Sequence, residues 1–163
     1  MRSIKLLLAV VLLLGITACA PSKFKTYRGP EVTRVLVFKE DRKLFLMHHY
    51  KVLKDYDIGL GFAPDGHKAF EGDGRTPEGT YYIDRRNPNS AFHLSIGISY
   101  PNPVDVEVAR AAGRSPGGDI FIHGEARPDK PRDWTWGCIA VSNKEIEWIY
   151  AMVRDGTPID IYP

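Results

Sequence analysis

Ile120-Phe121-Ile122-His123-Gly124 and Thr135-Trp136-Gly137-Cys138 are the two stretches of sequence that decide how this chain is interpreted. The three apolar residues predict a buried strand, and His123 follows at its end. Cys138 stands fifteen positions after that histidine, next to a glycine. A thiol is mostly protonated at neutral pH, and a neighbouring imidazole takes its proton or holds the thiolate as an ion pair. The two stretches therefore predict a nucleophile, Cys138, with His123 as its base.

The N-terminal residues have the composition of an export signal. Arg2 and Lys5 precede an apolar run over residues 6–14 that is too short to span a bilayer stably. The next residues, Ile16-Thr17-Ala18-Cys19, resemble a bacterial lipobox, in which the cysteine becomes lipidated. We expect residues 1–18 to be a cleaved lipoprotein signal peptide and residues 19–31 to be a tether that carries the lipid on Cys19. An uncleaved anchor and an ordinary signal peptide are the alternatives.

Cleavage leaves residues 19–163, and this chain has a length that suits one domain, expected over residues 32–163, rather than two. Without Arg2 and Lys5, its 20 basic side chains balance 20 acidic ones, which gives no support for a nucleic-acid partner. The predicted location is the cell envelope, facing the periplasm and held in a membrane by the lipid. Ala20 favours the outer membrane, because an Asp at this position commonly marks retention at the inner membrane.

Cysteine usage supports a function for the second thiol. The chain has two cysteines, and lipidation of Cys19 leaves Cys138 without a partner in an oxidising compartment. A buried inert cysteine and a Cys19–Cys138 disulfide are the alternatives.

The hydrophobic pattern predicts a β-rich α+β fold with mixed β-sheets and a few short helices. Ser142 and Glu145 have the spacing of a capping box at the start of the clearest helix, and Gly156 is placed to stop it. The expected strands cover residues 33–39 and 43–49 as a hairpin, 50–61 as its continuation, and 80–84, 91–98, 120–122 and 159–162, with a further helix over 104–112 closed by Gly113.

His123-Gly124 followed by Thr135-Trp136-Gly137-Cys138 resembles the signature of the L,D-transpeptidase catalytic domain, the YkuD-type fold. Two further segments resemble the same family: Gly72-Asp73-Gly74-Arg75-Thr76-Pro77-Glu78-Gly79, and Ile98-Ser99-Tyr100-Pro101-Asn102. The resemblance covers most of residues 32–163. It implies the YkuD-type fold and cysteine-dependent acyl transfer in cell-wall remodelling.

The resemblance also implies roles for particular residues. Cys138 attacks the amide carbonyl after the L-centre of the diamino acid in a peptidoglycan stem peptide, and His123 moves the proton. The backbone N–H groups of Gly137 and Cys138 are candidate oxyanion donors. The carbonyl of Trp136 is a candidate partner for the second imidazole nitrogen. Substrate contacts are expected from Gly124, Thr135, Trp136 and Tyr100, and no metal or other cofactor is expected.

Purely structural roles are alternatives to substrate contact for two of these residues. Thr135 could supply only a turn hydroxyl, and Trp136 could only hold its loop in place. One position departs from the family pattern. Many members have an arginine two positions after the cysteine, where this chain has Ala140. Arg75, Arg127 and Arg132 are candidates to replace it, and spacing does not choose among them.

The form Asp-Trp-Thr-x-Gly-Cys-Ile-Ala-Val resembles a branch of envelope proteins in which some members hydrolyse peptidoglycan-linked bonds. An L,D-carboxypeptidase, or an amidase that releases a wall-linked lipoprotein, therefore stays an alternative to transfer at the same site.

Two other classes of function are weighed against a thiol enzyme. One is a metal-binding envelope lipoprotein, although the histidines and Cys138 show no familiar ligand spacing, and His48 and His49 are expected to point to opposite faces of a strand. Its candidate ligands are His48, His49, His67, His93, His123 and Cys138. The other is a non-catalytic wall-binding module, which has no need of a nucleophile.

Overall fold

Alternating apolar residues build the first three strands of the sheet. A computed structural model describes residues 22–125, 129 and 131–163 of the chain. Strands β1 (Arg34–Phe38), β2 (Lys43–His48) and β3 (Lys51–Asp57) form an antiparallel meander. Every second residue of β1 and β2 is buried, which follows from the two-residue repeat of a strand. The predicted hairpin and its continuation are confirmed.

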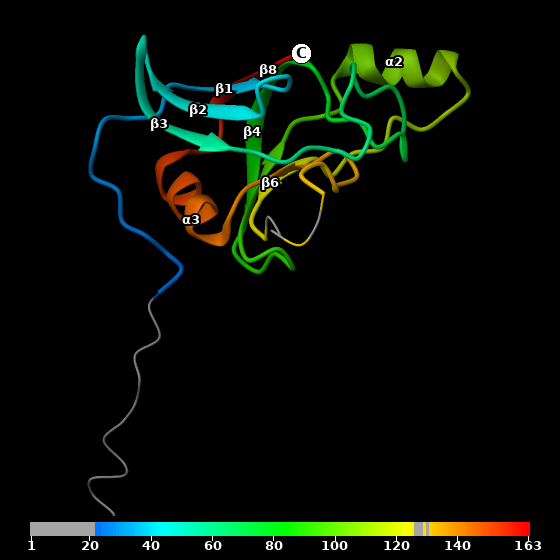
Figure 1. Ribbon diagram of the computed structural model, residues 1–163. Coiled ribbons are helices and arrows are strands. Elements are labelled where there is room, and N and C mark those ends of the chain that lie inside the picture. Colours follow the sequence, from blue (N-terminus) through cyan, green and yellow to red (C-terminus); the bar gives the residue numbers. More distant parts are fainter. Residues whose placement is uncertain (1–21, 126–128, 130) are drawn as a thin grey trace, which may run out of the picture.

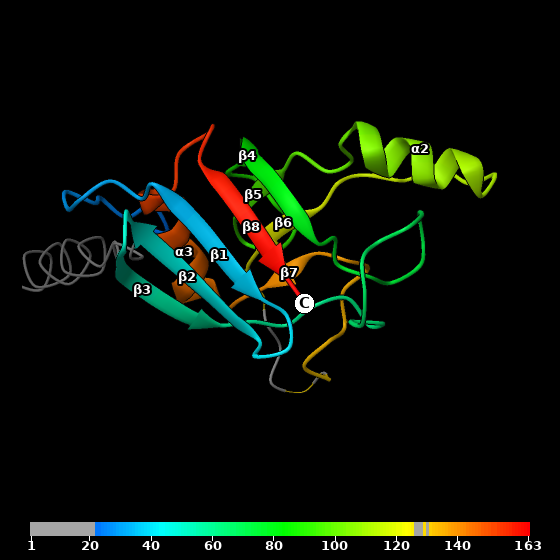
Figure 2. The same ribbon diagram turned by 90° about the horizontal axis from the view of Figure 1, so that it is seen from above.

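The longest strand, β4 (Gly79–Asn87), joins the two halves of the sheet. The first residues of β4 pair with β8 (Pro158–Tyr162). From Ile83 on, β4 pairs with β5 (Ser95–Ile98), with a bulge between Ile83 and Arg85. Strand β8 also pairs with β1 in parallel, although it is the last strand in sequence. A bulge bends a strand and increases its twist, so the sheet curls at this point (Figures 1 and 2).

The far end of the curled sheet carries the cysteine and the histidine. Strand β6 (Phe121–His123) runs antiparallel to β5, and the two-residue strand β7 (Ile139–Ala140) lies parallel to β6. The order across the sheet is β3-β2-β1-β8-β4-β5-β6-β7. Residues after β3 then bridge back to β7, because Gly59 exchanges two backbone hydrogen bonds with Ala140 at 2.9 and 2.8 Å. The two edges of the sheet are thereby linked.

Helix α3 (Asn143–Met152) covers one face of the sheet and supports β5 and β6. The predicted capping box is confirmed, since Ser142 and Glu145 satisfy each other's backbone N–H groups. Ile146, Ile149 and Met152 are buried and form one core with the strands. The expected stop at Gly156 is wrong: the backbone is already extended at Val153, and Gly156 lies in the turn before β8.

Helix α2 (Pro103–Ala111) projects from the body of the molecule (Figure 1). Asn102 caps its first turn and Asp105 completes a second capping box. Gly113 follows with a positive φ of 65°, which glycine adopts without strain, so the predicted end of this helix is confirmed.

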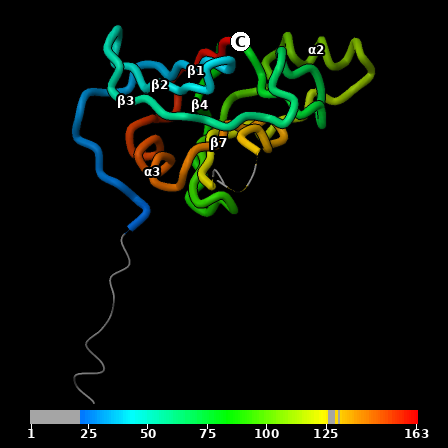
Figure 3. Tube along the Cα trace, viewed as in Figure 1, coloured from blue at the N-terminus to red at the C-terminus, as the bar shows by residue number. Residues whose placement is uncertain are grey.

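The described part of the expected tether is not free, because residues 22–31 lie against the domain (Figure 3). Phe24 packs on Tyr150, Lys25 forms a 3.1 Å ion pair with Glu147, and Tyr27 packs against the core. The signal peptide and Cys19 lie outside the described residues. No helix among the residues that the structure describes is long and apolar enough to cross a membrane.

Candidate active site

Cys138 and His123 open into the same pocket, which has a volume of about 290 Å³. Strand β6 delivers the histidine, and the turn before β7 delivers the cysteine. The remaining walls come from the loop between β4 and β5 and from the residues that lead into β6. The full lining is Asn87, Ser90, Ala91, Phe92, Ser95, Asp119, Phe121, His123 and Cys138.

The tautomer of His123 follows from its backbone partner. Its Nδ1 lies 2.7 Å from the carbonyl oxygen of Gly124. A carbonyl only accepts hydrogen bonds, so Nδ1 carries the proton and Nε2 has the free lone pair. The expected partner, the carbonyl of Trp136, is wrong. The next residue along the chain holds the imidazole instead, because the backbone turns back at the end of β6.

Two aromatic rings enclose the His123 imidazole, which is only 3% exposed. The ring of Phe92 lies 4.5 Å away at an interplanar angle of 30°, and Trp134 approaches edge-on at 5.8 Å. Burial lowers the pKa of His123 below its ordinary value of 6.5, although the Gly124 hydrogen bond and the Glu125 charge partly oppose this. The imidazole is therefore neutral at pH 7 and is able to accept a proton.

The Cys138 thiol is half-buried, and its Sγ lies 3.5 Å from the carbonyl oxygen of Asp119. Burial raises the pKa of this thiol above its ordinary value of 9.0. A backbone hydrogen bond from Phe121 and the charges of Lys68 and Arg85 act in the opposite direction, but they do not outweigh burial. The resting pair is therefore a thiol and a neutral imidazole rather than a thiolate and an imidazolium.

The turn that carries Cys138 is shaped by the Thr135 hydroxyl and anchored by the Thr135 backbone, which bonds with Leu60 and Phe62 at 3.1 and 3.0 Å. The Thr135 hydroxyl donates to the Cys138 carbonyl at 2.7 Å and accepts the Gly137 N–H at 3.2 Å. Gly137 has a φ of +122°, and a Cβ there would lie 2.5 Å from the carbonyl oxygen of Arg75. Only glycine fits this position without strain.

The oxyanion donors expected at this turn are therefore not equivalent. The Gly137 N–H is already engaged by Thr135, so the structure does not support its expected role as a donor. The Cys138 N–H has no partner among the described residues and is the available donor. Thr135 is 3% exposed and both contacts of its hydroxyl lie within the turn, which fits the role of a turn hydroxyl rather than substrate contact.

Three other expected substrate contacts do not line the pocket. Gly124 is buried where a Cβ would meet Asn143 at 2.6 Å, so its role is close packing and the support of His123. Tyr100 is buried, packs on Tyr81 and donates its hydroxyl to a backbone carbonyl at 3.0 Å. Trp136 is 70% exposed and contacts Phe62 edge-on, outside the pocket. Tyr100 is buried and the Trp136 side chain points away from the pocket because of tertiary packing, which the spacing of residues in the sequence does not reveal.

The candidates to replace the family arginine are mostly engaged elsewhere. Ala140 itself is fully buried opposite Gly59. Arg132 donates to the backbone carbonyls of Ile58 at 3.1 Å and Arg42 at 3.3 Å, and Arg75 reaches only the His67 carbonyl. Arg127 lies outside the described residues.

Arg85 is a site residue that sequence reasoning missed. Its guanidinium lies 3.2 Å from Asp119 and 4.5 Å from the ring centroid of Phe121, and both of these residues line the pocket. It reaches this position because β4 is bulged next to it. Phe92 is a second pocket residue that the sequence analysis did not predict. The sequence hints at it only by placing an aromatic residue at the end of a polar turn.

The described residues contain no group of three or more His, Cys, Asp and Glu side chains placed to hold a metal. The histidines are dispersed: His67 pairs with Asp105, and His93 pairs with Glu147. The rings of His48 and His49 lie 4.5 Å apart, so the expectation of opposite faces is wrong. Strand β2 ends at His48, and His49 lies in a turn with a positive φ of 52°.

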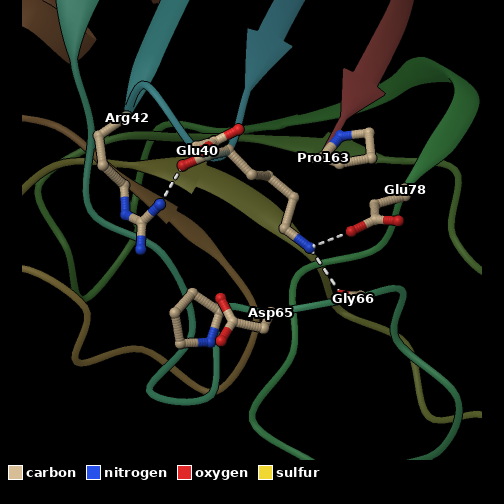
Figure 4. A pocket seen from close by; sticks show the side chains of 8 residues that line it. Glu40, Arg42, Asp65, Gly66, Glu78 and Pro163 are labelled. Atoms are coloured by element: carbon tan, nitrogen blue, oxygen red, sulfur yellow. Dashed lines mark hydrogen bonds and ion pairs between the residues drawn. The ribbon is translucent and has the colours of Figure 1, made fainter.

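A larger pocket, of about 410 Å³, lies between the end of β1 and the C-terminus (Figure 4). Its buried cation, Lys39, donates at 2.6 Å to both Glu78 and the Gly66 carbonyl, as the dashed lines show, and to the Thr76 carbonyl at 3.2 Å. All three donors of the ammonium are used, so it offers no charge to a ligand. The lining has no nucleophile, and the chemistry lies at Cys138.

Comparison with known proteins places the whole domain in one family. The family model of the L,D-transpeptidase catalytic domain (YkuD) matches residues 32–161. The chain is 31% identical to a protein of Escherichia coli K12 described as "Putative L,D-transpeptidase YafK", with all of this chain and 71% of that protein covered. The chain belongs to the L,D-transpeptidase catalytic domain family, and the predicted YkuD-type fold is confirmed.

Two solved structures extend the likeness. The helical cell shape determining protein Pgp2 from Campylobacter jejuni is 27% identical with a TM-score of 0.61, over 83% of this chain and 49% of that one. Bd1075 from Bdellovibrio bacteriovorus is 25% identical with a TM-score of 0.57, over 85% of this chain and 50% of that one. The chain spans about half the length of these two solved proteins.

Proposed function

We propose that this member of the L,D-transpeptidase catalytic domain family transfers acyl groups on peptidoglycan stem peptides through a thioester at Cys138. One observation carries the proposal. The thiol and a neutral imidazole of fixed tautomer open into the same pocket, and Nε2 is the nitrogen left to accept a proton. A nucleophile and a base that share one pocket are the groups that covalent acyl transfer requires.

The first half of the reaction forms the thioester. His123 Nε2 takes the thiol proton while Sγ attacks the amide carbonyl after the L-centre of the diamino acid. The Cys138 N–H donates to the oxygen that becomes negative. His123 then gives the proton to the leaving amine as the C–N bond breaks, and the acyl group stays on sulfur.

The second half of the reaction releases the acyl group. An acceptor amine from another stem peptide attacks the thioester carbonyl and loses a proton to His123, and the proton returns to the cysteine sulfur as the C–S bond breaks. Water in place of the amine turns the same chemistry into hydrolysis.

The envelope assignment belongs to the same proposal. Lipidation at Cys19 would hold the domain at a membrane that faces the wall, with the outer membrane favoured by Ala20. Stem peptides are then within reach of the site, and a wall-linked lipoprotein is a second candidate substrate. The similar Campylobacter protein Pgp2 is described as a determinant of helical cell shape, which is consistent with a role in cell-wall remodelling.

The experiment incubates the purified full chain with tetrapeptide muropeptides and with lipoprotein-linked muropeptides, and reads the products by mass spectrometry. Cross-linked dimers and an acyl adduct on the peptide that contains Cys138 are expected. The Cys138→Ala variant should keep the fold, because the thiol gives up only its contacts with the backbone of Asp119 and Phe121, and should lose both products. Shortened monomers or freed lipoprotein, without cross-linked dimers, would show that the enzyme hydrolyses its substrate and does not transfer the acyl group. Turnover that survives in Cys138→Ala would overturn the mechanism.

A further inference from the structure

The N-terminal strap, residues 22–27, reaches the loop that forms one wall of the active-site pocket. We call this loop, residues 88–93, the covering loop, because it carries the ring that lies on His123. The Lys23 ammonium donates to the carbonyl of Pro88 at 2.7 Å and to the carbonyl of His93 at 3.0 Å. These two carbonyls lie at opposite ends of the covering loop, so one cation closes it.

The covering loop contacts His123 directly and also contacts Gly124, whose carbonyl holds the His123 ring. The ring of Phe92 lies 4.5 Å from the His123 imidazole, and the Phe92 carbonyl accepts the Gly124 N–H at 3.1 Å. The Gly124 carbonyl in turn holds His123 Nδ1. A shift of the loop therefore acts on the imidazole from its face and through its hydrogen-bond partner.

Apart from Lys23, the loop is tied to the rest of the protein only near its second end, through Phe92 and the His93 ring. Its internal hydrogen bonds are short-range, from Asn89 N–H to Asn87 Oδ1 at 2.9 Å and from Phe92 N–H to Ser90 Oγ at 3.1 Å. Bonds of this kind shape a turn but do not fix it against the rest of the protein. His93 adopts a positive φ of 69°, a conformation that costs free energy in a non-glycine residue.

A second tie from the strap reinforces the first. Lys25 pairs with Glu147 at 3.1 Å, and the His93 ring nitrogen Nε2 contacts the other oxygen of that carboxylate at 2.9 Å. Burial acts to raise the pKa of Glu147, but the hydrogen bonds from His93 and Lys25 outweigh it and lower the pKa. The carboxylate is therefore ionised at neutral pH, and it connects the strap, α3 and the loop.

We propose that Lys23 is a positioning residue for His123, acting by closing the covering loop so that Phe92 stays on the imidazole. This role rests on the proposed function, in which His123 is the base. The strap precedes the catalytic domain matched by the family, which begins at residue 32. The segment expected to be a passive tether would then be part of the active site's support.

The test replaces Lys23 in the full chain and follows His123 directly. Lys23→Met removes the ammonium but keeps the apolar stem, and Lys23→Arg keeps two donors for the two carbonyls. Lys54→Met is the matched control, because Lys54 is an exposed lysine on β3 at the other edge of the sheet. The NMR titration of the His123 ring, assigned with a His123→Gln variant, needs no substrate, and kcat, KM and their pH dependence are measured beside it.

Lys23→Met should raise the pKa of His123 towards 6.5, because a loosened loop lets water reach the ring. Its kcat should fall about tenfold with a smaller change in KM, since the base is misplaced while the rest of the pocket stands. Lys23→Arg should restore both values, and Lys54→Met should match the wild type. The His123 pKa and kcat of Lys23→Gln, which keeps one donor group, should lie between those of the Met and Arg variants. This variant takes the place of Lys23→Met if the latter does not fold.

An unchanged His123 titration in Lys23→Met, or an equal change in Lys54→Met, would overturn the role of Lys23. Failure of the proposed function gives a different result. Wild-type protein would then lack turnover on stem peptides, while the NMR titrations would still report whether Lys23 controls the imidazole.

Discussion

The two walls of the active-site pocket are held in different ways. The turn at 135–138, which carries the nucleophile, is shaped by hydrogen bonds between residues two and three positions apart, and its first residue, Thr135, is also paired through its backbone with Leu60 and Phe62. The covering loop, which lies over the base, is closed by Lys23 from 65 and 70 positions away and by α3 through Glu147. The turn of the nucleophile is thus shaped from within and anchored at its first residue, whereas the loop over the base is closed by side chains from distant segments.

This difference predicts how each wall responds to substitution. A local turn fails when one of its own residues changes, because each residue fills a geometric requirement. A loop held from a distance loosens by degrees, because each tie carries part of the restraint. Substitutions in the turn should therefore have larger effects than those in the loop.

Gly137→Ala should have the largest effect. The new Cβ would lie 2.5 Å from the Arg75 carbonyl at a φ of +122°, so the turn must shift and carry Cys138 with it. We expect turnover to fall by about 100-fold or more and the free energy of unfolding to fall by about 2–3 kcal/mol. Steady-state assays and urea denaturation measure the two. Gly113→Ala is the matched control, because its φ is also positive but nothing lies within 4 Å of its Cβ.

Thr135→Val should come next. Valine keeps the shape but removes the acceptor for the Gly137 N–H and the donor to the Cys138 carbonyl. Loss of these buried contacts should cost about 1–3 kcal/mol of stability and lower kcat by about tenfold. Thr135→Ser, which retains the hydroxyl, should stay close to the wild type. Equal behaviour of the Val and Ser variants would show that the hydroxyl does not hold the turn.

Phe92→Ala tests the other wall and should act mainly through pH. Removal of the ring exposes the His123 imidazole, so its pKa should rise towards 6.5. The base must be neutral to accept a proton, so the acid limb of the kcat/KM profile should move to higher pH. Activity at pH 6 should then fall by about threefold, and less at pH 8. Phe62→Ala, an exposed aromatic outside the pocket, is the control, and an unshifted acid limb in Phe92→Ala would contradict the shielding role.

Trp136→Ala should have the smallest effect. The side chain is 70% exposed and contacts Phe62 outside the pocket. The free energy of unfolding should change by no more than about 0.5 kcal/mol, and kcat/KM should stay at the wild-type value. A large rise in KM would return Trp136 to the substrate contacts that the sequence predicts.

Prediction from sequence succeeded where the deciding interactions are local. The hairpin around residues 40–42 and the capping box of Ser142 and Glu145 depend on neighbours within a few positions, and both are confirmed. It failed where distant segments compete for one atom or one surface. Tyr100, for which substrate contact and core packing are both expected readings, lies buried against Tyr81. The partner of the His123 imidazole is an exception to this rule, because Gly124, which holds it in place of Trp136, is the next residue along the chain.

The sequence by itself determined the family, the pair Cys138 and His123 as the chemistry to look for, and the strand and helix content. These depend on residue types at fixed spacing, and that spacing can be read directly from the amino-acid sequence. Only the tertiary structure decided the neutral state of the pair, the place of Arg85 at the pocket and the closure of the covering loop by Lys23. Burial and contacts between distant residues set those properties, and both exist only once the chain has folded.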